Sequence, residues 1–218
     1  MTTDARSRTA WRDHPAPRVL GSALGWFGLA LALTLLVQAT AALSDLGGFC
    51  ARGGAFEITV ECTDAIDAFL VWPELGGLVA VGASLLLTRG FGTPVAVYAW
   101  TAVFLSLGGV FARSFVERGD WSGLIIAVLF ALVAIAPLAV VLPVAPQRLV
   151  LGRVDVRGHP FSDAHLSRPG IVARTPPAPP GENPPSAADW LLSLGIVAAS
   201  ASLGIALGSV WFTAATTL

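Results

Sequence analysis

The chain has 218 residues, 55% of them hydrophobic and only 12% charged. A soluble domain carries about 25% charged residues, so this composition excludes a surface that faces water on all sides and predicts cover by lipid. The formal net charge of −1 excludes a nucleic-acid-binding surface, which needs an excess of basic groups.

Five apolar segments are long enough to cross a bilayer as helices, which takes about 20 residues each. Their apolar character runs around the whole helix rather than along one stripe, as is typical of burial in lipid. The sequence therefore predicts an all-α membrane protein, a bundle of five transmembrane helices. We predict the segments at 20–43, 69–88, 94–112, 122–144 and 189–212.

These segments divide the chain into four regions. A basic N-terminus comes first, then four segments with one long loop, a proline-rich loop and a last segment. The boundaries are 1–19 for the N-terminus, 20–145 for segments one to four with loop 44–68, 146–188 for the proline-rich loop and 189–218 for segment five.

Segment one has a second interpretation as a cleaved signal sequence. Ala39, Thr40 and Ala41 form a small-residue cleavage site after a basic start, and cleavage would leave four spans. Signal sequences have apolar cores of about 7–15 residues. The greater length of segment one favours an uncleaved anchor.

The arginines predict the orientation. All but three of the thirteen lie in the N-terminus, between segments two and three, or between segments four and five. Basic residues stay on the cytoplasmic side of a membrane. We therefore expect a bacterial plasma-membrane protein with a cytoplasmic N-terminus and an extracytoplasmic C-terminus. In this orientation the three arginines on the outer side are Arg52, Arg113 and Arg118.

Cys50 and Cys62 are the only cysteines, and both fall in the loop predicted to lie outside. Thiols there are oxidised, and closing a loop of this length stabilises the fold by about 3 kcal/mol in the chain-entropy model. We expect a disulfide that staples a small outer loop. Free thiols are one alternative. A metal site is another, but it needs about four ligands, and no histidine lies on this side.

The same loop carries a resemblance. Cys50, Gly53, Gly54, Phe56 and Ile58, followed by Cys62, look like the outer-loop signature C-x-x-G-G-P-[YF]-x-I…C-P of an uncharacterised family of multi-pass membrane proteins from actinobacteria. Ala55 and Thr63 stand where that signature has prolines. The resemblance covers loop one and the start of segment two, and implies a bacterial plasma-membrane protein with no known activity.

Glu74 is the acidic residue inside a predicted span, and intramembrane carboxylates are candidate proton or cation sites. The favoured interpretation is structural. Pro73 suits the first helical turn, which would put Glu74 beside the positive end of the helix dipole at the outer interface, next to Trp72.

Arg113 ends segment three and is followed by further charged residues. It can meet the acids around loop one, such as Asp45, and help to form an anion or substrate vestibule. Exposed groups of this kind are more often solvated interface anchors, worth under about 1 kcal/mol per pair.

Small residues recur every four positions in three segments, a pattern that lets helix backbones approach closely. We expect these stripes to pack the bundle internally rather than to dimerise it. Pro137 is expected to kink or end segment four, and residues 148–157 alternate weakly enough to form a small hairpin. The stripes are Gly21 and Gly25; Gly76, Ala80 and Ser84; and Ser200, Gly204 and Gly208.

Three classes of function remain, and we rank them. The first is an accessory or interaction subunit that acts through its loops on a membrane protein partner, or as a homo-oligomer. The second is a small transporter or channel component, for which Thr34, Gln38, Thr101 and Ser106 offer little polar lining. The third is an enzyme, which we do not expect because no catalytic, cofactor-binding or metal-binding constellation is recognisable.

Overall fold

The computed structural model describes residues 15–46, 66, 68–88, 92–141, 148–152 and 187–216. Cys50, Cys62 and most of the proline-rich loop lie outside these residues. Every element in the described part is a helix. The elements are α2 (Pro15–Asp45), α3 (Ala68–Thr88), α4 (Val95–Arg118), α5 (Trp121–Val141), α6 (Arg148–Leu151) and α7 (Ala187–Thr216).

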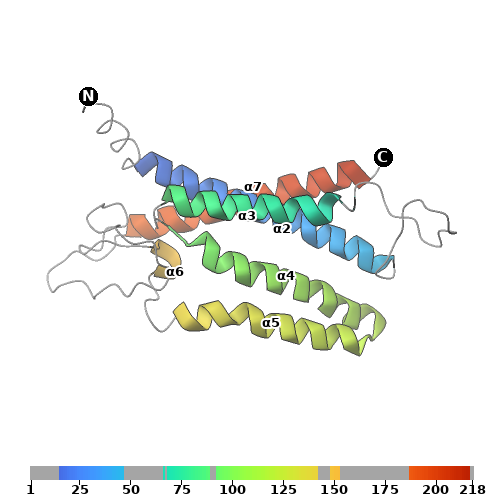
Figure 1. The fold of residues 1–218 in the computed structure, drawn as a ribbon. Coiled ribbons are helices and arrows are strands. Elements are labelled where there is room, and N and C mark those ends of the chain that lie inside the picture. The colour runs from blue at the N-terminus through green and yellow to red at the C-terminus, as the bar shows by residue number, and fades with distance from the viewer. Residues whose placement is uncertain are drawn as a thin grey trace, which may run out of the picture.

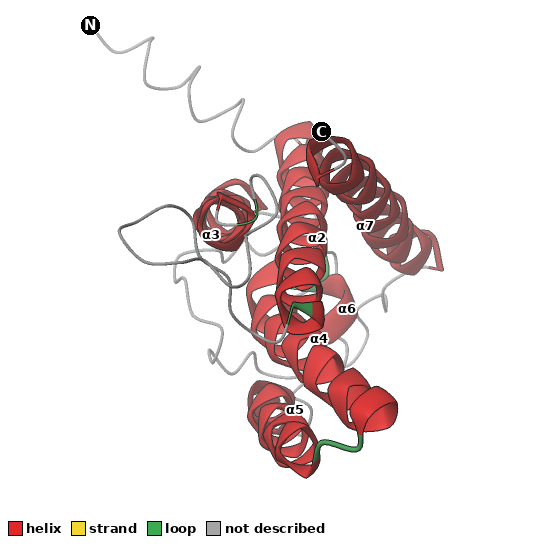
Figure 2. Cartoon of the chain, turned by 90° about the vertical axis from the view of Figure 1, so that its right-hand side faces the viewer, coloured by secondary structure: helices red, strands yellow, loops and turns green. Residues whose placement is uncertain are grey.

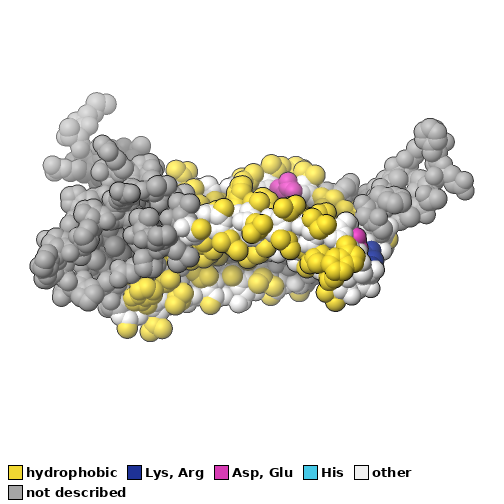
Figure 3. Space-filling model, turned by 90° about the horizontal axis from the view of Figure 1, so that it is seen from below, with side chains coloured by type: hydrophobic (Ala, Val, Ile, Leu, Met, Phe, Trp, Pro, Cys, Tyr) yellow, Lys and Arg dark blue, Asp and Glu magenta, His cyan; other side chains and the backbone are white. Residues whose placement is uncertain are grey.

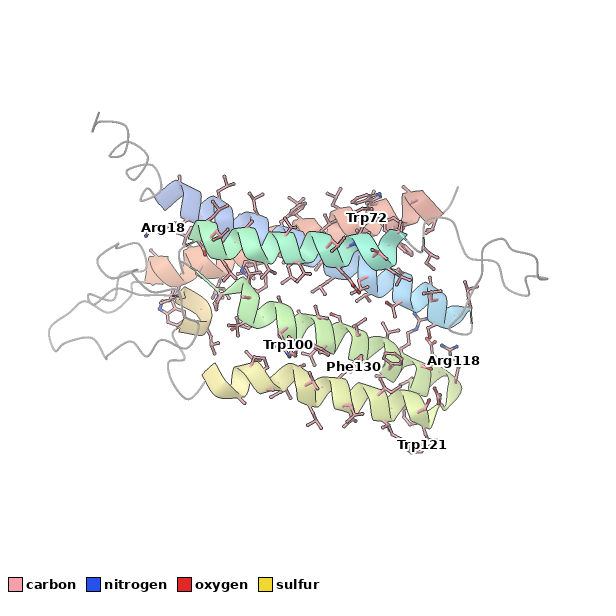
Figure 4. All side chains as sticks on the ribbon, in the orientation of Figure 1. Arg18, Trp72, Trp100, Arg118, Trp121 and Phe130 are labelled. Atoms are coloured by element: carbon pink, nitrogen blue, oxygen red, sulfur yellow. The ribbon has the colours of Figure 1, made fainter. Side chains whose placement is uncertain are left out.

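Five of these helices are long and apolar enough to cross a membrane, which confirms the prediction of five spans. They run side by side, so that the chain passes back and forth along one long axis (Figure 1). Hydrophobic side chains cover the middle of the visible face in Figure 3. The two labelled arginines, Arg18 and Arg118, lie at opposite ends of the bundle (Figure 4). These ends are named below the Arg18 end and the Arg118 end.

Helix α2 is the centre of the bundle. Seen along the axis, α3 lies on one side of it and α7 on the other, with α4 next to it and α5 beyond α4 (Figure 2). Its contacts with α3 and α7 are extensive, and α4 packs mainly against α5. The molecule is thus a three-helix unit with a helical hairpin attached to its central member.

Glycines bring α2 and α3 into close contact. A Cβ on Gly25 would lie 2.5 Å from Ser84 Cβ, and a Cβ on Gly28 would lie 2.5 Å from Ala80 Cβ. This confirms that the small-residue stripes of segments one and two pack internally. Gly76 was predicted to take part, but a Cβ there would meet nothing within 4 Å, and the neighbouring Gly77 faces Ala32 instead.

The stripe of segment five packs on the opposite side of α2. A Cβ on Gly204 would lie 2.5 Å from the backbone oxygen of Phe27, and a Cβ on Gly208 would lie 3.0 Å from Thr34 Cβ. Because the neighbour at Gly204 is backbone, it cannot rotate away. Glycine at position 204 is therefore a requirement for the contact between α2 and α7.

Helices α4 and α5 form a hairpin closed by a very short turn. Gly119 has φ 71°, and its N–H donates to Phe115 O, which ends α4. Glycine suits this left-handed position because it has no Cβ. Asp120 then begins α5 by accepting hydrogen bonds from the backbone N–H and the hydroxyl of Ser122 (3.0 and 2.7 Å).

Segment one is part of the core of the fold. Ala39, inside the proposed cleavage site, is 0% exposed and packs in a buried apolar cluster with Leu35, Ile66 and Phe69. Removing α2 would take away the helix that α3, α4 and α7 all contact. The packing therefore agrees with an uncleaved helix.

Candidate functional site

Polar side chains gather at the Arg18 end, where α4 begins and α6 meets α7. The backbone N–H of Thr93 donates to Ser193 Oγ (3.1 Å), and its hydroxyl donates to Val150 O (2.9 Å). Ser193 Oγ also donates to Val150 O. Both hydroxyl side chains are almost fully buried.

The same cluster binds the other carbonyls of α6. Tyr98 Oη donates to Leu149 O (3.1 Å), the Gly92 N–H donates to Leu151 O (3.1 Å), and Trp26 Nε1 donates to Thr93 O (3.1 Å). Consecutive carbonyls of α6 therefore accept hydrogen bonds from residues 92–98 and from Ser193 of α7, while Trp26 of α2 binds Thr93. This cluster fastens the beginning of the proline-rich loop to the bundle.

The cluster also corrects the first half of the hairpin predicted over residues 148–157; residues 153–157 lie outside the described part of the chain. Residues Arg148–Leu151 form a single helical turn rather than a strand. Leu149 and Leu151 are both buried, and their carbonyls are satisfied by side-chain and turn donors rather than by a second strand. An alternation of so few residues was too short to distinguish a strand from a turn of helix.

A charged cluster at the Arg118 end joins α2 to α4. The Arg118 guanidinium donates to Ser44 O and Ser44 Oγ (2.9 and 2.7 Å). Arg113 pairs with Glu117 at 2.7 Å and with Asp45 at 3.9 Å. The prediction that Arg113 meets an acid near loop one is thus confirmed for Asp45.

This cluster has little room for a substrate. Arg113 and Asp45 are about half exposed (52% and 55%). The hollow that they line with Ser44 and Glu117 has a volume of about 10 Å³, which is close to the space one water molecule needs. Exposed pairs of this type are screened by solvent. The geometry fits a clasp between two helices better than a vestibule.

Inside the bundle, Pro137 creates the need for an unusual hydrogen bond. Proline has no N–H, so Pro137 in α5 leaves the carbonyl of Val133 without its helical donor. The indole Nε1 of Trp100 donates to Val133 O at 3.0 Å, and Thr101 Oγ1 donates to Ala134 O at 2.9 Å. Helix α4 therefore supplies hydrogen-bond donors at the point where Pro137 removes a backbone donor from α5. The proline is thus accommodated by the packing of the hairpin.

Other polar side chains that were predicted as possible pore lining also form hydrogen bonds within or between the helices. The Thr34 hydroxyl donates to Ala30 O of its own helix (2.8 Å). Gln38 Nε2 donates to Ser209 Oγ across the contact between α2 and α7 (3.3 Å). Gln38 Oε1 is buried without a hydrogen-bond partner. These side chains stabilise helices and helix contacts.

Glu74 lies in a different place from the one predicted. Helix α3 begins at Ala68, so Pro73 stands inside the helix and not in its first turn. The interpretation of Glu74 as a helix-start residue was therefore wrong. The predicted bounds of this segment, 69–88, already placed Pro73 beyond the first turn, so the helix-start interpretation did not agree with them.

The packing of α3 on α2 gives the depth of Glu74. The two helices are antiparallel, and Gly28 faces Ala80 while Ala32 faces Gly77. Continuing this register puts Glu74 level with Leu35. The apolar span of α2 runs from Arg18 to Asp45, so Glu74 lies roughly 15 Å from the level of Asp45 and roughly 25 Å from that of Arg18.

Glu74 is thus close to the middle of the apolar span, yet it is exposed on the surface of α3. Among the residues that the structure describes, none forms a hydrogen bond or ion pair with its carboxylate. Figure 3 shows acidic side-chain atoms within the apolar surface, away from the end where other charged atoms gather. A charged side chain at the centre of a bilayer costs about 3 kcal/mol on insertion scales, and such residues normally face a protein partner or a cavity.

The remaining predicted site residues fall outside the described part of the chain. Cys50 and Cys62 cannot be placed, so their disulfide stays a prediction. In the described ranges, no three histidine, cysteine, aspartate or glutamate side chains gather where they would hold a metal ion. Glu74 and Arg113 are therefore the candidates that the structure locates, one within the span and one at its end.

Comparison with known proteins assigns no family or activity. No protein-family model, no curated protein and no solved structure matches the chain. The function has to be inferred from the arrangement of the residues themselves.

Proposed function

We propose that the protein is an integral plasma-membrane protein that acts by binding other proteins, as an accessory or interaction subunit. The observation that supports this most is the position of Glu74, which points out of the bundle at mid-span. Side-chain donors between the helices, by contrast, bond to backbone carbonyls or to each other, and Gln38 Oε1 is left buried without a partner. Among the described residues, Glu74 is the charged side chain that lies well within the apolar length of the bundle, and it is directed outward, toward a neighbour.

The two ends of the bundle support the same proposal. The cluster around Thr93 and Ser193 holds α6, from which the proline-rich loop continues. The clasp between Arg118 and Ser44 holds the end of α2, from which loop one continues. Both loops thus start from fixed points, an arrangement suited to presenting them to partners.

The proposal includes an orientation and a disulfide. By the distribution of arginines, the Arg18 end is cytoplasmic and the Arg118 end faces outside. Cysteine labelling at position 170 of intact cells should then require permeabilisation of the membrane. Mass spectrometry without reduction should give a peptide that links Cys50 to Cys62, and free thiols on intact cells would contradict the stapled loop.

Affinity purification tests the proposal directly. The full-length protein, tagged at one terminus and extracted in mild detergent from its native host, should copurify with one partner in a stoichiometric ratio. An unrelated five-span protein with the same tag is the control. Recovery of a homogeneous protein with no partner would refute the interaction subunit.

A small transporter or channel component is the second candidate, and the depth of Glu74 favours it. A path would then form between copies, with the Glu74 carboxylates passing protons or cations along the shared surface. Purified protein in liposomes should then show flux that is lost in Glu74→Gln. Flux that depends on Glu74, from an oligomer without other subunits, would reverse our ranking.

A further inference from the structure

Helix α3 has two faces with different roles. Gly77, Ala80 and Ser84 face α2 and build the bundle. Residues at a second helical spacing form another face, which begins about a quarter turn from this contact, at Glu74. This second face, called the α3 outer face, consists of Val71, Glu74, Leu78, Gly82 and Leu85.

The α3 outer face is open in the isolated chain. Val71, Leu78 and Leu85 are 50–70% exposed, and a Cβ on Gly82 would meet nothing within 4 Å. Of the five spans, α3 has the smallest buried share, 11%. The face is therefore not needed to fold the bundle, and Gly82 leaves a low point at which another helix backbone can approach.

Glu74 distinguishes this face from an ordinary lipid-facing surface. Lipid tails offer a carboxylate neither a counter-charge nor a hydrogen-bond donor, and ionisable residues at this depth pair with one another or with protein groups. A second copy of the chain has no basic residue to offer, because none of its thirteen arginines falls within the central part of a span. Charge complementarity therefore favours a different protein.

We infer that the α3 outer face docks a transmembrane helix of a partner protein, and that this helix carries a lysine or arginine at the depth of Glu74. The inference rests on the proposed function, since it names the chemistry of the partner. The apolar residues on either side of Glu74 would pack against the partner helix. The ion pair would set its register and depth.

Synthetic membrane peptides test the chemistry without knowledge of the partner. Two leucine-rich transmembrane peptides, identical except for lysine or leucine at the matching depth, are added to the full-length protein in liposomes, and binding is measured by energy transfer. The lysine peptide should bind at least about tenfold more tightly than the leucine peptide, and Glu74→Gln should abolish the difference. Equal binding of the two peptides would overturn the inference.

Two neighbouring positions locate the contact. Leu78 lies on the α3 outer face, whereas Val79 is turned away from it, and both are about 70% exposed. A photo-crosslinking residue at position 78 should capture the lysine peptide, and one at position 79 should not. Glu117→Gln, which removes a carboxylate at the Arg118 end, should leave peptide binding unchanged. Equal capture from both positions would contradict docking on this face.

The outcomes also separate this inference from the proposed function. If the tagged wild-type protein retrieves a stoichiometric partner and Glu74→Gln retrieves it equally well, the docking face is wrong and the interaction subunit stands. If Glu74 instead promotes association between labelled copies of the chain, a second copy is the occupant and the inference fails. Loss of the partner in Glu74→Gln alone, together with lysine-peptide selectivity, supports the inference.

Discussion

The bond between Trp100 and Val133 gives the sharpest test of the packing argument. Trp100→Phe keeps an aromatic ring on α4 but removes the Nε1 donor that reaches Val133 O at 3.0 Å. Pro137 offers that carbonyl no N–H. Trp100 is half exposed on a helix that is long and apolar enough to cross a membrane, so we expect no water to replace the lost donor.

The size of the effect follows from hydrogen bonds measured in membrane proteins. Such bonds contribute about 0.6 kcal/mol on average and up to about 1.7 kcal/mol. A carbonyl left without any donor lies toward the upper part of that range. Trp100→Phe should therefore lower the free energy of unfolding by about 1 kcal/mol, roughly a fivefold change in the equilibrium constant.

The loss of unfolding free energy in Trp100→Phe should depend on whether residue 137 is proline. In the Pro137→Ala background, the new backbone N–H at position 137 can donate to Val133 O, and the indole donor becomes redundant. The double-mutant cycle should thus give a coupling of about 1 kcal/mol. Trp72→Phe is the matched control, since Trp72 is an exposed indole on α3 that points away from the bundle (Figure 4).

Equilibrium unfolding in mixed micelles, followed by far-ultraviolet circular dichroism, measures these four free energies. If Trp100→Phe costs the same with proline or alanine at position 137, then the indole does not replace the missing helical donor. A cost no larger than that of Trp72→Phe would refute the reasoning equally.

Three further predictions concern other contacts. Gly204→Ala should destabilise the protein by about 1–3 kcal/mol through the clash with Phe27 O, whereas Gly195→Ala, with open space around it, should be neutral or stabilising by thermal unfolding. Ser193→Ala should cost about 1–2 kcal/mol and speed amide exchange at Thr93, whose N–H donates to Ser193 Oγ. The hydrogen bond from the Ser122 hydroxyl lowers the pKa of Asp120, so the α5 cap should persist at neutral pH and be lost as pH falls through that lowered pKa, as followed by the Ser122 amide resonance.

Each of these has an outcome that would contradict it. Equal effects of Gly204→Ala and Gly195→Ala would mean that α7 does not depend on close approach to α2. Unchanged exchange at Thr93 would mean that Ser193 does not hold this cluster together. Asp120→Asn keeps the cap but cannot titrate, so a pH response that persists in this variant would arise elsewhere. A carboxylate whose pKa is lowered by folding contributes stability that is fully present above its unfolded-state pKa and is lost as pH falls through its folded-state pKa.

The five spans could be predicted because length and hydropathy in lipid leave few alternatives to a helix. The glycine contacts were also predictable as intramolecular, but the exact partners were not. Gly77 replaces Gly76 at the contact with Ala32, a shift of one residue. Which side of a helix faces inward depends on its rotation, and an apolar helix has little amphipathic pattern to fix that rotation.

The depth of Glu74 could not be predicted for a related reason. Proline is common in the first turn of a helix, and this favoured the helix-start interpretation even though the predicted segment begins at residue 69. The actual register is set by Gly25 and Gly28 against Ser84 and Ala80, contacts between segments far apart in the chain. Such contacts fix how far one helix slides along another, and no local pattern near Glu74 reports it.

The hydrogen bond to Val133 O could be predicted only in part. A proline inside an apolar span predicts that the carbonyl four residues earlier lacks its helical hydrogen-bond donor. The sequence does not say which side chain donates to that carbonyl instead, because this depends on the register of the α4–α5 hairpin. Gly108 against Phe130, and Gly123 against Phe111 O, set this register.

The contact between α2 and α7 has a consequence for biogenesis. Among the five spans described, α2 leaves the ribosome first and α7 last, yet Gly204 and Gly208 of α7 close directly on α2. Until α7 has been made, that side of α2 must be held by lipid or by the insertion machinery. A chain truncated before α7 would therefore expose the face of α2 around Ala30, Leu31 and Thr34, a signal by which membrane quality control can tell a chain that has α7 from one that lacks it.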